Sequence, residues 1–209
     1  IFTPNAKAFE SNIQKANNKR RDNMMKCLEV CATIFGLIQG VLVMCNKRSN
    51  WIAYVIQMAF LIVFSAFNHL YGDVVNNSIY FVIGIIGFIL WKNEDKAIPQ
   101  FCTVKQRVMY ILVILIGTIG IAMILRTTDD PLPLLDAFTT VSSLVATYYM
   151  MNKKIDTWFI WFVNDIFYAL EYFILPDQAI YLFWLNVVWV FMAVGSFLNW
   201  NKIRRNANE

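Results

Sequence analysis

Long stretches without a charged residue constrain the fold of this chain more than any other feature. At 1.5 Å per residue, stretches of this length, with a few flanking residues, cross a hydrocarbon layer of about 30 Å as helices. Their apolar residues are continuous rather than alternating, which favours helices over the strands of a membrane barrel. The seven stretches, of which the sixth contains two acidic residues, are Val30–Asn46, Ser49–Gly72, Val74–Trp91, Val108–Leu125, Ala137–Asn152, Trp158–Ile174 and Gln178–Asn201.

The composition agrees with a membrane protein. Of 209 residues, 58% are hydrophobic and 15% are charged, whereas soluble domains have about 25% charged residues. Seven helices of about 20 residues need about 140 residues, which leaves no room for a second domain. The net charge of +4 is small and scattered, so the lipid bilayer is an expected partner and nucleic acid is not. We therefore predict an all-α, multi-pass membrane protein with seven transmembrane helices.

Basic residues divide unequally between the two sides of the predicted membrane. The segments after the second, fourth and sixth stretches contain only Arg126. Because cytoplasmic loops are enriched in Lys and Arg, the division places the C-terminus in the cytoplasm. The basic residues that follow the odd-numbered stretches are Lys47, Arg48, Lys92, Lys96, Lys105, Arg107, Lys153, Lys154, Lys202, Arg204 and Arg205.

Each end of the chain is polar and basic. Residues 1–24 lack the apolar core of a secretory signal peptide, and we expect them to be an interfacial or disordered lead-in. With seven spans this tail lies outside, where its basic residues run against the charge rule. Residues 202–209 are expected to form a basic cytoplasmic tail.

The two halves of the chain resemble each other. Shared acids, amides and tryptophans are rare coincidences in apolar sequence, although chance similarity is the alternative. The match predicts a parallel 3+1+3 repeat, with three helices in residues 25–92, a loop and linker helix in 93–127, and three helices in 128–201. Such repeats occur in transporters, with the substrate site at the repeat interface. Shifts of 107 and then 109 residues align Glu29 with Asp136, Trp51 with Trp158, Tyr54 with Trp161, Gln57 with Asn164, Asn77 with Asn186, Tyr80 with Trp189 and Trp91 with Trp200.

The sixth stretch carries polar and aromatic residues at helical spacing. Trp158, Trp161, Asp165 and Tyr168 share one helix face, and Asn164 and Glu171 flank it. An ionisable residue inside a membrane is costly unless it faces a cavity or a partner, so Asp165 is a candidate functional residue. The alternatives are a structural hydrogen-bonding role for Asp165, an interfacial anchor for Trp158 and a wetted position for Glu171.

Two amides near the starts of the third and seventh stretches are further candidates for the site that the sixth stretch indicates. Asn77 and Asn186 are each followed three residues later by an aromatic residue, Tyr80 or Trp189. Amides also hold membrane helices together, which is the alternative explanation. With Gln57 and Asn164, these residues describe a pocket with aromatic walls and amide edges. A planar, polar heterocycle fits that chemistry, and a cationic ring would also be favoured by the aromatic faces and Asp165.

The remaining sequence features do not point to catalysis or metal binding. Glu29 and Asp136 are expected to cap the first and fifth helices. The chain lacks the phosphate-binding loop of nucleotide hydrolases. One histidine, His69, and four scattered cysteines do not form a metal-binding pattern or a disulfide framework. We expect no cofactor and no metal, and a membrane-embedded enzyme is the minor alternative.

Several of these residues form a pattern that resembles the PnuC family of bacterial nicotinamide riboside transporters. The similarity covers about residues 25–205. It is most specific in Trp158-Phe-Ile-Trp161 followed by Asp165, with support from Leu135-Asp-Ala-Phe-Thr-Thr, the Lys153-Lys154 turn and Trp91. The resemblance implies a homotrimer in the bacterial inner membrane that moves nicotinamide riboside by facilitated diffusion. A cytoplasmic kinase would trap the imported vitamin by phosphorylation.

The family pattern also assigns residues to the ligand. Trp158, Trp161 and Asp165 match its signature, and Gln57, Asn77 and Asn164 fall where the family places polar groups. Thr147 stands where many members have Gln, and Gly84 replaces a common amide. Related members carry thiamine or riboflavin, so these vitamins are alternative substrates. Ion-coupled uptake through Asp165 or Glu171 is the alternative mechanism.

Overall fold

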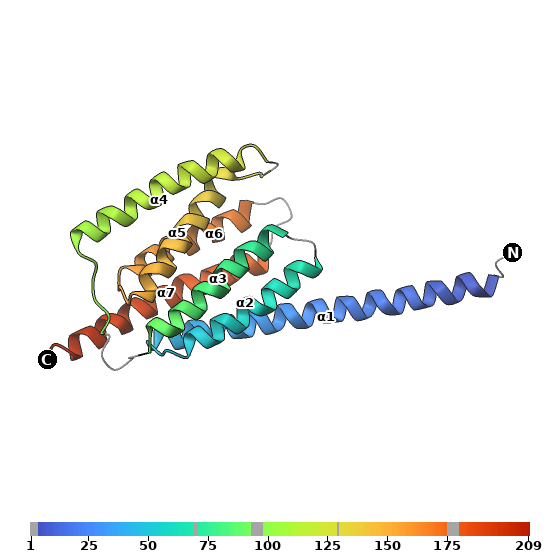
Figure 1. Cartoon of the computed structure of the whole chain (residues 1–209), viewed down its shortest axis with the longest axis horizontal. Coiled ribbons are helices and arrows are strands. Elements are labelled where there is room, and N and C mark those ends of the chain that lie inside the picture. The colour runs from blue at the N-terminus through green and yellow to red at the C-terminus, as the bar shows by residue number, and fades with distance from the viewer. Residues whose placement is uncertain (1–3, 69–70, 93–97, 129, 175–179) are drawn as a thin grey trace. The chain divides into compact units, whose positions relative to one another are not determined.

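The computed structural model describes residues 4–68, 71–92, 98–128, 130–174 and 180–209. This part of the chain forms seven α-helices and no strand, which confirms the predicted all-α architecture (Figure 1). His69 and the predicted start of the seventh span at Gln178 lie outside the described residues. The helices are α1 (Pro4–Met44), α2 (Asn50–Phe67), α3 (Tyr71–Leu90), α4 (Val104–Leu125), α5 (Pro133–Met151), α6 (Thr157–Ile174) and α7 (Ile180–Asn206).

The helices differ in how apolar they are, and α1, α4 and α7 also include charged residues near their ends. Within the described residues, four segments are long and apolar enough to cross a membrane by themselves: Asn17–Met44, Asn50–Phe67, Val104–Leu125 and Phe183–Asn206. Val74–Leu90 is a shorter apolar segment. The α5 helix contains several hydroxyl residues and α6 contains two acids, which lowers their hydropathy. More than half of the α5 residues are buried, so this helix needs little lipid-facing surface.

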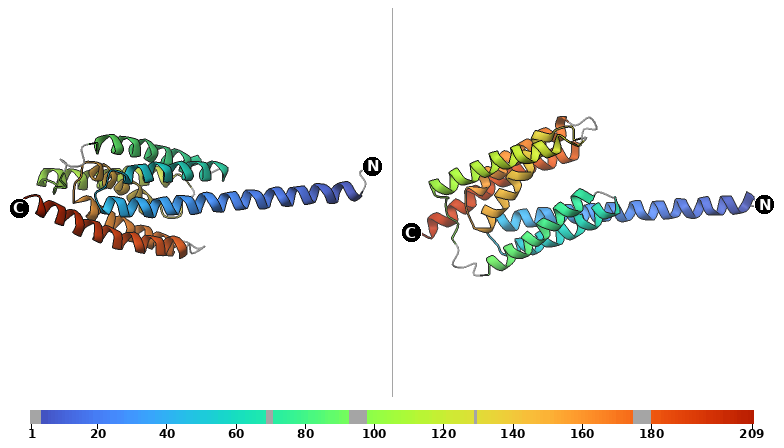
Figure 2. Two further views of the ribbon diagram at one scale, coloured as in Figure 1. Left: turned by 90° about the horizontal axis from the view of Figure 1, so that it is seen from below. Right: turned by 45° about the horizontal axis from the view of Figure 1, so that its top comes forward.

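The described part of the N-terminal tail is ordered, which corrects the expectation of disorder, whereas an interfacial position remains a prediction. The tail is helical from Pro4 and continues directly into the first predicted span (Figure 2). After Pro4 the tail contains no Gly or Pro and includes several Ala, Lys and Arg residues, so a helix that starts in the apolar part can extend through it. The predicted helix cap at Glu29 is therefore wrong, because this residue lies inside α1. Asp136 lies in the first turn of α5, but the N-cap residue of this helix is Leu132 and it makes no side-chain capping bond.

The chain divides into two compact units, which we describe separately. The first unit contains residues 1–39 and 49–88, and the second contains residues 40–48 and 89–209. The boundary cuts α1 after Gln39 and α3 after Phe88, so Gly40–Met44 of α1 and Ile89–Leu90 of α3 belong to the second unit. The division does not coincide with the predicted repeat boundaries, and the 3+1+3 grouping remains a prediction.

Glycines allow close helix contacts in the first unit. A methyl group on Gly87 would lie 2.5 Å from the ring of Trp51, and one on Gly84 would lie 2.8 Å from Val55. Both contacts join α3 to α2. Trp51 is fully buried, so its ring fills the space that the missing side chain of Gly87 leaves.

In the second unit, α5 lies between α4 and α6, and α6 packs on α7. The buried hydroxyl groups of α5 bond mainly to its own main chain, as Thr147 Oγ1 does to the Ser143 carbonyl at 2.8 Å. Such bonds satisfy the hydroxyl groups inside an apolar bundle. A central helix rich in Ser and Thr is therefore compatible with burial.

The turns after α1 and α5 have the same geometry, at positions 107 residues apart. Asn46 and Lys153 have positive φ angles of 54° and 51°. The next residue closes each turn: Lys47 N donates to Leu42 O, and Lys154 N donates to Tyr149 O, both at 2.9 Å. This correspondence supports the predicted internal repeat.

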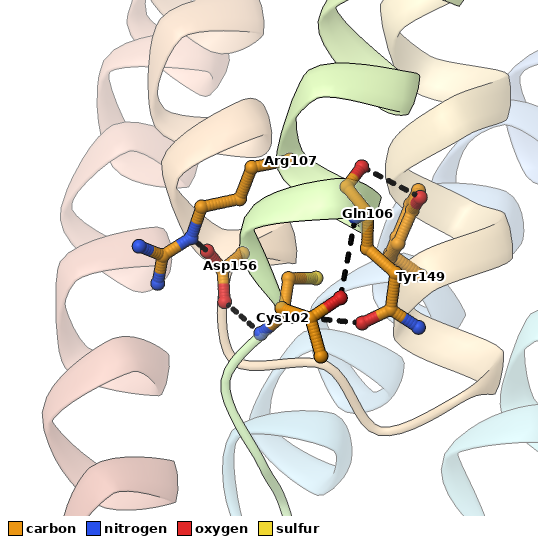
Figure 3. Close-up of polar contacts among 6 residues, drawn as sticks. Cys102, Gln106, Arg107, Tyr149 and Asp156 are labelled. Atoms are coloured by element: carbon orange, nitrogen blue, oxygen red, sulfur yellow. Dashed lines mark hydrogen bonds and ion pairs between the residues drawn. The ribbon is translucent and has the colours of Figure 1, made fainter.

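A buried carboxylate ties the start of α6 to the segment before α4 (Figure 3). Asp156 Oδ2 accepts from Cys102 N at 2.7 Å, and Oδ1 accepts from Arg107 Nε at 2.6 Å. Thr103 and Gln106 form a capping box at the start of α4. Burial raises the pKa of the Cys102 thiol to about 11, and the negative charge of Asp156 adds to the rise.

Candidate functional site

The middle of α6 places two polar side chains inside the second unit. Asn164 is fully buried and Asp165 is 6% exposed. No hydrogen bond or ion pair to the Asp165 carboxylate is present among the described residues. A buried carboxylate without a partner is costly, so its presence in a predicted membrane span indicates a role beyond packing.

Asn164 is held by the neighbouring helix. Ser142 Oγ, on α5, donates to Asn164 Oδ1 at 2.6 Å. The other end of the amide, Nδ2, has no hydrogen-bond partner in the described part of the chain. The bond fixes the orientation of the amide and leaves one donor for a polar group of a ligand.

The two tryptophans of the sixth stretch have different surroundings. Trp161 is half-buried and packs against the α4–α5–α6 core that includes Val145, Tyr149 and Ile160. Trp158 is 6% exposed and packs edge-on against Trp200 of α7, with ring centroids 5.1 Å apart. The structure therefore places Trp158 in an aromatic cluster at the helix ends, one turn from Trp161.

The other predicted residues of the second unit lie on α6 and α7. Tyr168 and Asn186 are half-buried, and both have interactions within the protein. Trp189 packs against Gly40, where a methyl group would lie 2.6 Å from its ring. Glu171, the alternative ion-coupling residue, is half-buried one turn beyond Phe167 on α6.

Three predicted site residues lie in the first unit. The amide of Gln57 contacts Gly36, and Asn77 Nδ2 donates weakly to Ser65 Oγ at 3.5 Å. The ring of Tyr80 meets that of Tyr54 edge-on, with centroids 6.4 Å apart. The bond between Asn77 and Ser65 fits the alternative explanation, an amide that holds two helices together.

Sequence reasoning missed two contributors to these clusters. Ser142, which orients Asn164, gave no signal beyond the hydroxyl-rich fifth stretch. Tyr54 contacts both Trp51 and Tyr80 in the first unit. Its signal was the alignment of Tyr54 with Trp161 in the two halves of the chain.

Buried polar groups on membrane-crossing helices are characteristic of membrane transport proteins, because they mark the path of a polar solute. Comparisons with known proteins agree with this class. A statistical model of the family described as "Nicotinamide mononucleotide transporter" matches residues 26–202. The chain belongs to this family, the PnuC family of membrane transporters, and is a multi-pass bacterial membrane protein rather than an enzyme.

Curated relatives include transporters of two vitamins. The nicotinamide riboside transporter PnuC of Neisseria mucosa is 24% identical over 193 residues, covering 85% of this chain and 73% of the relative. PnuC of Haemophilus influenzae is 25% identical and covers 87% and 82%. The riboflavin/roseoflavin transporter RibM of Streptomyces davaonensis is 28% identical over 149 residues and covers 66% and 68%.

A solved structure has the same fold. The crystal structure of the vitamin B3 transporter PnuC is similar with a TM-score of 0.68 and 24% identity, over 86% of this chain and 82% of that one. The similarity concerns the arrangement of the helices.

Proposed function

We propose that this protein transports nicotinamide riboside across the bacterial inner membrane by facilitated diffusion. The observation that carries the proposal is the buried Asn164–Asp165 pair beside Trp161 on α6, in a chain that belongs to the PnuC family. Two curated relatives are described as nicotinamide riboside transporters.

The side chains of α6 suit this substrate. Nicotinamide riboside has a flat, positively charged ring, a carboxamide and ribose hydroxyls. The ring would stack on Trp161, and Asp165 would balance its charge. The Nδ2 group of Asn164 would donate to a ligand oxygen, because it has no partner among the described residues. Tyr168, Asn186 and Trp189 are further candidate contacts, whereas Gln57, Asn77 and Tyr80 remain predictions from the sequence.

Calorimetric titration of purified protein with nicotinamide riboside, thiamine and riboflavin tests the substrate. We expect the tightest binding for nicotinamide riboside. The relative described as a riboflavin/roseoflavin transporter makes riboflavin the second candidate. Tighter binding of riboflavin or thiamine would overturn the assignment.

The Trp161→Ala variant tests the stacking surface. We expect at least tenfold weaker binding of nicotinamide riboside, because stacking contributes about 1 kcal/mol beyond the area that the ring buries. Trp184→Ala is the matched control, since this tryptophan is 59% exposed on α7. Equal affinities of the two variants for nicotinamide riboside would show that Trp161 is not part of the binding site.

The energy source can be tested in proteoliposomes without ion gradients. We expect labelled nicotinamide riboside to equilibrate across the membrane, and to accumulate only when a nicotinamide riboside kinase and ATP are enclosed. Accumulation that instead depends on an imposed proton or sodium gradient would favour ion coupling through Asp165 or Glu171. Native mass spectrometry would test the proposed homotrimer of the 24.3 kDa chain.

A further inference from the structure

Two tryptophans at helix ends bind main-chain carbonyl groups of other helices in the second unit. Trp91, just after α3, donates its indole N–H to Met151 O at the end of α5, at 2.9 Å. Trp200, on α7, donates to Val43 O near the end of α1, at 2.8 Å. The two rings are 2% and 0% exposed. The Trp200 bond is buried, and the Trp91 bond is part-buried.

The two bonds are nearly reciprocal between the halves of the chain. Trp91 and Trp200 align in the sequence, and Val43 aligns with Met150, the neighbour of Met151. Each half therefore uses its last tryptophan to hold the end of the first helix of the other half. Asn199 adds a third bond from α7, donating to Met44 O at 2.8 Å.

The same indoles fill the space among these helix ends. The rings of Trp91 and Trp200 lie 6.0 Å apart, and Trp158 packs on Trp200 at 5.1 Å. The Lys153 ammonium lies 4.2 Å from the centre of the Trp91 ring, where the electron-rich face attracts it. The three tryptophans form one aromatic cluster, which we call the tryptophan latch (Trp91, Trp158 and Trp200).

We propose that the tryptophan latch is the cytoplasmic gate of the transporter and that it is closed in this structure. This inference rests on the proposed transport function and on the cytoplasmic orientation of the basic turn at Lys153-Lys154. In this proposal, a solute leaves toward the cytoplasm between the ends of α1, α3, α5 and α7. Separating these ends breaks the bonds of Trp91 and Trp200 and exposes the indoles.

The latch is suited to opening because its bonds are few. One hydrogen bond stabilises a closed state by a modest net amount, so its loss shifts the population of open molecules about fivefold. Trp91→Phe or Trp200→Phe removes one donor and keeps an aromatic ring. Each variant should therefore open more often without losing the filled cluster.

A cysteine at Ser196 reports the opening. Ser196 is 1% exposed and lies one helical turn before Trp200 on α7. In a chain whose four native cysteines are replaced, Ser196→Cys is labelled with a membrane-impermeant maleimide added to inside-out vesicles. We expect labelling about fivefold faster with Trp91→Phe or Trp200→Phe, and faster still with both.

Trp184→Phe is the matched control and should leave the labelling rate unchanged, because this ring is largely exposed. Asn199→Ala removes the third bond without changing an indole, and should also speed labelling if the tryptophan variants do not fold. If the folded Trp91→Phe, Trp200→Phe and Asn199→Ala variants were labelled at the control rate, the tryptophan latch would not be a gate. Because the readout needs no ligand, failure to bind nicotinamide riboside would count only against the proposed substrate.

Discussion

Single buried side chains connect segments that are distant in this sequence. Asp156 is the clearest case: its side chain is 3% exposed, whereas that of its partner Arg107 is 45% exposed. The carboxylate also accepts from the main chain at Cys102. It thereby holds the start of α4 near the start of α6.

Replacing this carboxylate should destabilise the protein in a graded way. Asp156→Asn keeps an acceptor for Cys102 N but loses the ion pair, at a cost of about 1.5–3 kcal/mol. Asp156→Ala should cost more, because a buried N–H is left without an acceptor. Thermal unfolding in detergent measures the order. Asp22→Asn on the exposed face of α1 is the control, and equal melting temperatures for Asp22→Asn and Asp156→Ala would contradict the assignment.

The raised pKa of Cys102 predicts slow alkylation. With a pKa of about 11, the thiolate is a minor species at pH 8 and increases about tenfold for each pH unit up to pH 10. Iodoacetamide should therefore modify the exposed Cys45 well before Cys102 at pH 8. Peptide mapping by mass spectrometry follows both sites. Similar rates of modification at the two cysteines would show that Cys102 is not buried and that the pKa of its thiol is not raised.

At the scale of helices, glycine positions distinguish protein-facing from open surfaces. Gly87 faces the buried Trp51, whereas a methyl group on Gly120 of α4 would have no neighbour within 4 Å. Both glycines lie inside helices. Alanine substitutions at the two positions therefore distinguish the effect of packing on stability from the effect of helix propensity.

Gly87→Ala should destabilise the protein by about 1–3 kcal/mol, because the added methyl group overpacks a rigid contact. Gly120→Ala should be neutral or slightly stabilising, since Ala is the better helix former. Melting temperatures of the two variants test this contrast. A Gly87→Ala variant as stable as Gly120→Ala would mean that α2 and α3 do not approach as described.

The α5 and α6 helices both carry polar residues inside the second unit, and more than half of the α5 residues are buried. Their hydroxyl and amide groups bond to their own main chain or to each other, as Ser142 and Asn164 do. The α6 helix combines its buried polar face with an exposed apolar face that includes Phe159, Val163 and Phe173. Burial therefore accounts for the polar residues of α5 and for those on one face of α6.

At the scale of the whole molecule, the basic loops predict the orientation. Eleven basic residues follow the odd-numbered spans and one follows the even-numbered spans. Green fluorescent protein fused after Glu209 should fluoresce, and alkaline phosphatase fused there should be inactive, because the C-terminus is predicted to be cytoplasmic. The reverse pattern would place the tryptophan latch at the outer face.

The sequence by itself determined the seven helices, because each depends on a local run of apolar residues between charges. It also singled out Asn164 and Asp165, since polar groups are conspicuous inside such runs, and Trp161, which shares a helix face with Asp165. It did not foresee that α1 extends back to Pro4. Helix extension in the tail depends on the absence of breakers as much as on hydropathy.

Only the tertiary structure showed that residues close together in the sequence have different surroundings. Helical spacing placed Trp158 and Trp161 on one face, but packing assigned one to the helix ends and the other to the α4–α5–α6 core. The bonds from Ser142 to Asn164 and from Arg107 to Asp156 join residues 22 and 49 positions apart. Such contacts depend on how each helix is rotated about its axis, which is decided by packing against its neighbours.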